Sequence, residues 1–198
     1  YGLDGVFRER TAPLFRFLFE KYWRVGVTGL DNVPETGGAI LIGNHSGGLP
    51  FDATMVAYAL SECAGGPLRI VRPLYDRFVE GLGPVRDMYR KLGAVPARYA
   101  VADELLERGE LPLIFPEGMF GVAKLYEDRY QVGSFSTSAA RLSCRHRVPI
   151  IPFAVVGMRV DARTRAAHEL ERFLEGLDVP VLGFLRDTQV YVQAAAHG

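Results

Sequence analysis

The residues best suited to chemistry in this chain are a histidine and an aspartate on either side of a glycine-rich turn. His45 follows the apolar run of residues 39–42, and Asp52 follows the Gly-Gly-Leu-Pro turn of residues 47–50. An apolar run that ends in such a turn predicts a buried strand whose last residues enter a loop. A carboxylate that holds one ring nitrogen of an imidazole sets its tautomer and stabilises its charged form, so the pair predicts a general base.

Asp52 also has a plain structural explanation. Aspartate is favoured at helix N-caps, where it accepts hydrogen bonds from free N–H groups, and Asp52 stands directly before the helix predicted over residues 53–63. Other histidines have no comparable setting, and we expect them on the surface: His146, His168 and His197.

A second group of candidates follows another apolar run. Residues 111–115 lead into Pro116, Glu117 and Gly118, so the glutamate stands at the mouth of a predicted strand. A carboxylate between proline and glycine is positioned by the backbone, and the glycine permits close approach of a substrate chain. Glu117 could instead form a structural salt bridge.

The elements that must position these residues alternate between strand-like and helix-like patterns. Strands are predicted over residues 39–43, 68–71, 111–115, 150–156 and 189–193, and helices over residues 53–63, 85–91, 99–108, 134–145 and 163–175. This alternation indicates an α/β domain with a mainly parallel or mixed sheet flanked by helices. Ligand sites of such sheets lie outside the carboxyl ends of the strands, where the loops after residues 42 and 115 begin.

Before the sheet, residues 4–23 carry aromatic and aliphatic side chains at helical spacing, with basic residues between them. We expect Pro13 to start a second helix there. The stripe could pack on the sheet as core or lie in a membrane interface, and we expect a mixture of both. The predicted organisation is an amphipathic helical segment at residues 1–24 and an α/β domain at residues 25–198, with further residues expected beyond the ends.

Composition narrows the classes of function. The 198 residues fit one domain, 48% are apolar, and 23 basic residues balance 23 acidic ones. Neither the charge nor any motif indicates nucleic acid. Cys63 and Cys144 are far apart and predict free thiols, not a disulfide or metal site. The sequence contains neither a membrane-spanning apolar run nor a signal peptide pattern.

Four blocks, in order, resemble the glycerolipid acyltransferase superfamily. They are Asn-His to Asp at residues 44–52, Gly to Arg at residues 93–98, Phe-Pro-Glu-Gly at residues 115–118 and Val-Pro-Ile-Ile-Pro at residues 148–152. Together with a lead-in at residues 29–34, the resemblance runs to residue 156. It implies a glycerol-3-phosphate acyltransferase-like fold.

Two departures from the family pattern bear on the substrate. Six residues separate His45 from Asp52, where the common motif has four, and this spacing is similar to the lysophospholipid and monoacylglycerol acyltransferase-like branch. Gly118 is followed by Met-Phe, where phosphate-acceptor enzymes have Thr-Arg. A cation expected at an acceptor phosphate is therefore missing, and Arg98 and Lys124 are its candidate substitutes.

The resemblance implies transfer of a fatty acyl group from an acyl thioester, acyl-CoA or acyl carrier protein, to a hydroxyl of a glycerolipid or lysophospholipid. His45 would take the hydroxyl proton, oriented by Asp52, and backbone N–H groups of residues 46–48 would stabilise the oxyanion. Residues 116–118 would shape the acceptor site, with Arg98 at its polar head. No cofactor or metal is needed.

Partners and location follow from the same resemblance. Residues 69–98 hold a surplus of basic side chains, which could meet phosphates of coenzyme A or of lipid headgroups or form an ordinary solvated face. We expect a cytoplasmic enzyme bound peripherally to the cytoplasmic face of a membrane. The alternatives are a non-catalytic lipid-binding relative and a His-dependent thioesterase or lipid hydrolase.

Overall fold

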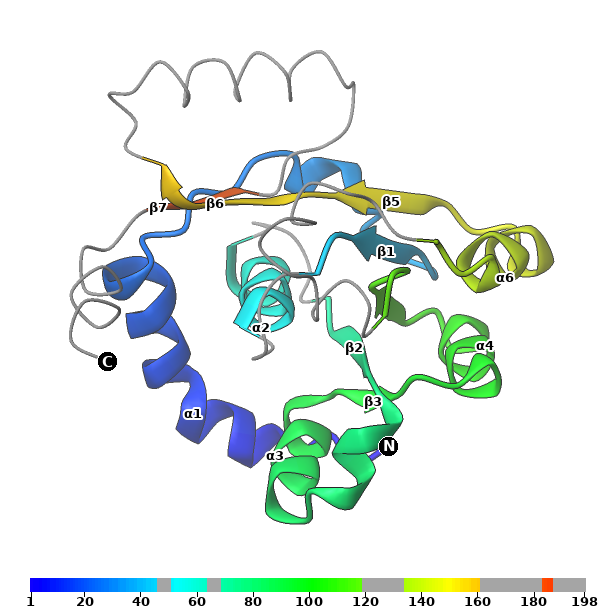
Figure 1. The fold of residues 1–198 in the computed structure, drawn as a ribbon, viewed down its shortest axis with the longest axis horizontal. Coiled ribbons are helices and arrows are strands. Elements are labelled where there is room, and N and C mark those ends of the chain that lie inside the picture. The colour runs from blue at the N-terminus through cyan, green and yellow to red at the C-terminus, as the bar shows by residue number, and fades with distance from the viewer. Residues whose placement is uncertain (46–50, 64–68, 119–133, 161–182, 187–198) are drawn as a thin grey trace.

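The computed structural model describes residues 1–45, 51–63, 69–118, 134–160 and 183–186. Its centre is a five-stranded sheet in the order β3-β2-β4-β1-β5, and every pairing in it is parallel (Figure 1). The strands are β1 (Ile40–Gly43), β2 (Val71–Tyr75), β3 (Val95–Pro96), β4 (Leu111–Ile114) and β5 (Ile150–Phe153). This architecture confirms the predicted α/β fold.

Helices and short helical turns connect the strands. The α-helices are α1 (Gly5–Phe17), α2 (Phe51–Tyr58), α3 (Pro84–Leu92), α4 (Tyr99–Glu107) and α6 (Ser138–His146). Shorter turns are η1 (Leu18–Tyr22), η2 (Leu30–Asn32), η3 (Ala59–Cys63) and η4 (Arg77–Gly81). The predicted helix over residues 99–108 is confirmed nearly to the residue, whereas the one over residues 134–145 starts only at Ser138.

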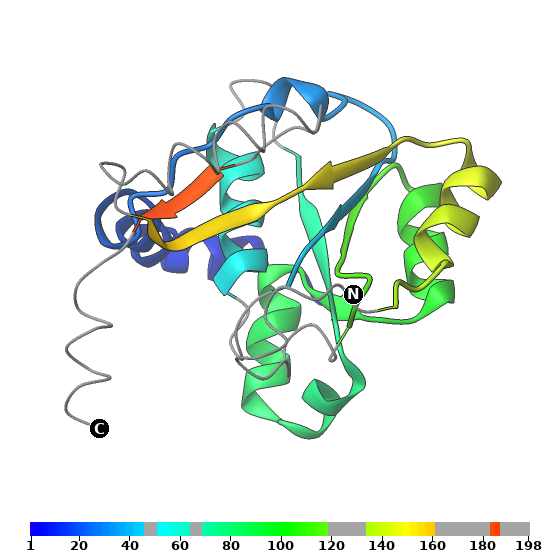
Figure 2. The ribbon, with the colours of Figure 1, turned by 45° about the horizontal axis from the view of Figure 1, so that its top comes forward.

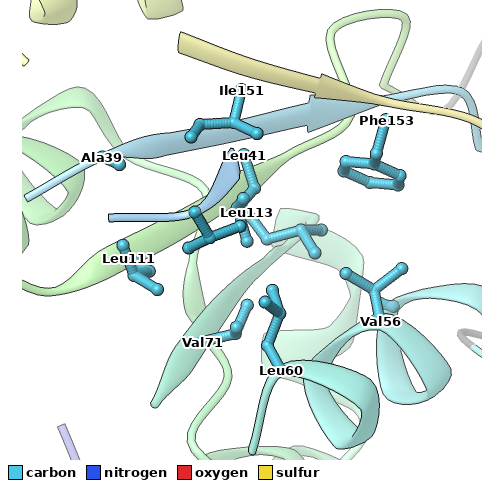
Figure 3. Packing of buried hydrophobic residues seen from close by; sticks show 11 residues of the cluster. Ala39, Leu41, Val56, Leu60, Val71, Leu111, Leu113, Ile151 and Phe153 are labelled. Atoms are coloured by element: carbon cyan, nitrogen blue, oxygen red, sulfur yellow. The ribbon is translucent and has the colours of Figure 1, made fainter. Parts of the chain in front are cut away.

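Alternating strand residues build a core on each face of the sheet. Leu41 and Leu113 join a cluster with residues of α2, which covers one face (Figure 3). Ile40 and Ile114 pack with residues of α4 and α6 on the other face, as Figures 1 and 2 show. Full burial of one such side chain contributes roughly 1.5–3 kcal/mol. Both faces are therefore covered, as a parallel sheet requires.

The second strand differs from its prediction. It runs over Val71–Tyr75 and not over residues 68–71, and it includes Arg72 and Pro73. Both residue types argue against a strand in the sequence. Arg72 is buried because Gly93 O and a Glu110 carboxylate oxygen accept its hydrogen bonds at 2.6 and 2.7 Å. β2 pairs with β3 only from Leu74 onward. The missing N–H group of Pro73 therefore costs no hydrogen bond to β3.

The predicted strand over residues 150–156 is two strands. β5 ends at Phe153, and β6 (Val155–Val160) pairs with β7 (Gly183–Arg186) in a separate parallel sheet. The Asn44 side chain explains the break. Its Nδ2 donates to Val155 O at 3.1 Å, and its Oδ1 accepts from Val155 N at 2.9 Å, so on this side the backbone of Val155 bonds to a side chain and not to the main chain of β1.

The N-terminal segment is one helix followed by a π turn. Pro13 lies inside α1, so the prediction of a second helix starting there is wrong. In η1 the Trp23 N–H donates to Leu18 O at 2.8 Å. Phe19 and Trp23 are buried against α2, whereas Val6, Leu14 and Phe17 of α1 are exposed. The stripe is thus divided between core and exposed surface.

Some expectations fall outside the described residues. They are the strand over residues 189–193, the helix over residues 163–175 and the oxyanion-binding turn of residues 46–48, together with Lys124, His168 and His197. Among the described helices, none combines the length and the apolar character that crossing a bilayer requires.

Candidate active site

The predicted His–Asp pair is assembled at the carboxyl edge of the sheet. His45 follows the end of β1, and its Nδ1 lies 2.6 Å from Oδ2 of Asp52, in the first turn of α2. The carboxylate is 4% exposed and the imidazole 19%. A carboxylate can only accept, so Nδ1 carries the proton of this contact, and in a neutral imidazole Nε2 then has a free lone pair. Within the described part of the chain no hydrogen bond reaches Nε2.

Asp52 serves the helix as well as the histidine. α2 begins at Phe51, so Asp52 is its second residue and not the N-cap. Its Oδ1 still accepts a hydrogen bond from the Ala53 N–H at 2.7 Å. The two carboxylate oxygens thus have separate tasks, and the helical bond fixes the direction in which Oδ2 faces His45. The structural and the catalytic explanation of this residue are compatible.

A ring stack places the second loop beside His45. Phe115 directly follows β4, the neighbour of β1, and its ring lies 4.2 Å from the imidazole, centroid to centroid, with 15° between the planes. Pro116 and Glu117, the next two residues, are buried, and Gly118 is exposed. The Gly118 N–H closes the turn by donating to Phe115 O at 3.0 Å. The predicted acceptor loop therefore starts beside the imidazole of His45.

Glu117 and Gly118 have the properties that the sequence predicted for a backbone-held turn. Glu117 is 9% exposed and is engaged within the protein, so its carboxylate is no freely mobile group. Gly118 has φ +56° with open space where a side chain would stand. Such a backbone favours glycine and leaves room for a ligand.

Arg98 lies apart from the dyad, in an open hollow of about 390 Å³. The hollow is lined by Arg77, Glu80, Pro96, Ala97 and Arg98. It follows β2 and β3, whereas His45 follows β1. With strands ~4.8 Å apart, the ends of β3 and β1 are separated by roughly 14 Å. Only an extended substrate could contact both Arg98 and His45.

The acidic member of this hollow is tied to a buried tyrosine. Glu80 Oε1 accepts a hydrogen bond from the Tyr75 hydroxyl at 2.7 Å. Burial of the phenol, reinforced by this carboxylate, raises the pKa of Tyr75 to about 12. Arg77 and Arg98 make no ion pair with another described residue, so the hollow offers two cations beside a carboxylate already engaged.

Two other basic residues of residues 69–98 serve the fold. Arg69 donates to three carbonyl oxygens, those of Pro34, Gly37 and Gly109. Burial lowers its pKa. Arg72 is held by Glu110 and Gly93, as described above. These guanidinium groups bind other parts of the chain. They are therefore neither phosphate-binding groups nor part of an ordinary solvated face, the two alternatives given for the basic residues.

A second His–Asp pair joins two helices away from the site. His146 of α6 lies 12% exposed with its Nε2 2.7 Å from Oδ1 of Asp103 in α4. The expectation of a surface histidine is wrong, because a partner 43 residues away in the sequence fixes it. Arg145 pairs with the same oxygen at 3.2 Å. This pair fastens α4 to α6.

Two further residues of the site were missed from the sequence. Asn44 clamps the chain before His45 to Val155, and Phe115 stacks on the imidazole. Both stand inside the predicted motifs, yet their roles depend on partners distant in sequence. Cys144 is exposed and free. The described residues contain no group of three or more side chains suited to hold a metal ion.

The parallel sheet presents a His–Asp dyad and a Pro-Glu-Gly turn at one edge. The profile of the acyltransferase family matches residues 24–156, so the chain belongs to that family. This match confirms the resemblance to the glycerolipid acyltransferase superfamily.

Similar proteins, each named only as an uncharacterized protein, occur in mycobacteria. Proteins of Mycobacterium tuberculosis, Mycobacterium bovis and Mycobacterium leprae are each 35% identical over 159 residues, which cover 79% of this chain. The match covers 44% of the first two proteins and 43% of the third, so the chain spans less than half of their length. No solved structure matches this chain significantly.

Proposed function

We propose that this chain transfers a fatty acyl group from an acyl thioester, acyl-CoA or acyl carrier protein, to a hydroxyl of a glycerolipid or lysophospholipid. The observation that carries the proposal is the 2.6 Å contact of His45 Nδ1 with Asp52, which in a neutral imidazole leaves the Nε2 lone pair free at the ligand edge of the sheet. A non-catalytic lipid-binding relative would not need a dyad in this geometry.

The proposed reaction uses His45 first as a base and then as an acid. Nε2 takes the proton of the acceptor hydroxyl while its oxygen bonds to the thioester carbonyl carbon. Asp52 stabilises the imidazolium that forms. When the tetrahedral intermediate collapses, the carbon–sulfur bond breaks and the imidazolium returns the proton to the thiolate. The products are an ester and a free thiol, and this proton transfer contributes ~10²–10⁴-fold to the rate.

The acceptor and donor would extend from the dyad across the sheet edge. Residues 116–118 lie on the path from His45 toward β2, and Arg98 with Arg77 offers charge for a phosphate. A phosphate of the acceptor headgroup or of coenzyme A would suit this hollow. Lys124 is a further candidate cation from the sequence.

We also propose that the protein binds peripherally to the cytoplasmic face of a membrane. Support comes from α1, where Val6, Leu14 and Phe17 are each more than half exposed and share one helix face with Arg10. Apolar side chains that enter the interface while cations remain at the headgroups are typical of such helices.

The test is thiol release coupled to analysis of the lipid products. Acyl-CoA is incubated with the full chain and with monoacylglycerol, lysophosphatidate or lysophosphatidylcholine. We expect His45→Gln to abolish thiol release above background, and the matched control His146→Gln to retain it. Equal thiol release by wild type and His45→Gln contradicts the catalytic assignment. Free fatty acid without an acylated acceptor identifies a thioesterase or lipid hydrolase instead.

A further inference from the structure

The contact between Phe115 and His45 does more than fill space. Asp52 holds one point of the imidazole, the Nδ1 atom, which restrains movement within the ring plane but restrains tilting of that plane less. A flat ring 4.2 Å away at 15° opposes such tilting, because it would drive one edge of the imidazole into the Phe115 face. The two contacts together fix the direction of Nε2.

Phe115 is itself held by a second ring. Phe153 lies 6.1 Å from it at 75°, an edge-to-face arrangement. Phe153 is only 5% exposed and belongs to the core that packs on α2 (Figure 3). The imidazole therefore rests on a ring that is supported from inside the protein.

The position of Phe153 depends on a glycine in β1, which leaves space for its ring. Gly43 and Phe153 are register partners in β1 and β5. A Cβ at position 43 would lie 2.4 Å from Cε2 and 2.5 Å from Cζ of the Phe153 ring. No such contact can persist, so any other residue at 43 would displace the ring, which has little free space because it is buried.

We infer that Phe115 is a positioning residue for His45, and that Gly43 and Phe153 form its support. The inference rests on the proposed function, in which Nε2 of His45 takes the acceptor proton. Misdirection of a catalytic group by about 1 Å can cost ~10²-fold in rate. The ring face of Phe115 also favours the imidazolium that forms when His45 is protonated.

The test separates the ring stack from catalysis. Stacking shifts the NMR signals of the imidazole ring protons upfield through the ring current of Phe115, and His45→Gln assigns those signals. We expect this shift in the wild type and in Phe115→Tyr, and its loss in Phe115→Leu. In the acyl-transfer assay, Phe115→Leu should lower kcat ~10- to 100-fold with KM nearly unchanged, while Phe115→Tyr stays close to wild type.

The variant Gly43→Ala tests the support of the ring stack independently, because it leaves Phe115 itself unchanged. It should weaken the upfield shift and lower kcat in the same direction, while thermal melting shows that the variant is folded. Absence of the upfield shift in the wild type overturns the inference, as does a Phe115→Leu variant that loses the shift but keeps the wild-type kcat. If His45-dependent thiol release is itself absent, the proposed function has failed, whatever the NMR signals show.

Discussion

Replacing Asp52 by asparagine changes one atom of the dyad and almost nothing in its shape. Oδ2 of Asp52 faces His45 Nδ1 at 2.6 Å, and Oδ1 accepts from the Ala53 N–H at 2.7 Å. An asparagine that keeps the Ala53 bond turns its NH₂ group toward Nδ1. Nδ1 must then accept, so the imidazole proton moves to Nε2 and the base is lost.

The opposite orientation of the asparagine is also unfavourable. Its oxygen then faces Nδ1, but its NH₂ group opposes the buried Ala53 N–H, which costs ~1–3 kcal/mol. The first orientation should therefore dominate in Asp52→Asn. We expect kcat to fall ~10³–10⁴-fold, as for the same exchange in a Ser-His-Asp triad, with only a small change in the free energy of unfolding.

The assay is thiol release at saturating acyl-CoA and acceptor, with urea unfolding of each variant. Asp103→Asn is the matched control, because it makes the same exchange in the His146 pair between α4 and α6. That variant should lose some stability and keep its kcat. A kcat of Asp52→Asn within threefold of wild type would refute the tautomer argument. Loss of stability without loss of kcat would leave Asp52 only its helical role.

Two predictions concern other parts of the molecule. Burial and Glu80 raise the pKa of Tyr75 from 10.0 to about 12, so the folded state keeps a proton that the unfolded chain loses. This contribution, at most ~2–3 kcal/mol, is present below pH 10 and lost between about pH 10 and 12. Urea midpoints should thus fall less steeply with pH in Tyr75→Phe, and parallel slopes would contradict the linkage. For the membrane proposal, Phe17→Ser should weaken flotation with anionic vesicles severalfold, whereas undiminished flotation would exclude the α1 face as a contact.

Much of the fold could be predicted because strand and helix patterns there are local. β4 is an almost uninterrupted apolar run and α4 has clear helical spacing, so both were found close to their true bounds. β2 was misplaced because Arg72 and Pro73 resemble a break. Only the structure reveals that Glu110 neutralises the arginine and that β3 pairs with β2 beyond the proline.

The site was predictable in part for the same reason. His45, Asp52 and Glu117 stand at strand ends or in glycine-rich turns, which the sequence displays directly. The fate of a basic side chain is different, since it depends on which groups the fold brings near. Arg69 binds carbonyls 32 to 40 residues away, while Arg98 remains open in a hollow. Charge counted along the chain cannot distinguish the two.

The side-chain amide of Asn44 bonds to the backbone of Val155 in the way that a peptide group of β1 would, although β1 itself ends at Gly43. The backbone at His45 therefore lies outside the strand, while the preceding residue is still hydrogen-bonded to Val155. Asp52 is held separately, in the first turn of α2. Since Asn44 and α2 hold the two residues separately, a spacing of six residues is compatible with a direct contact between His45 and Asp52.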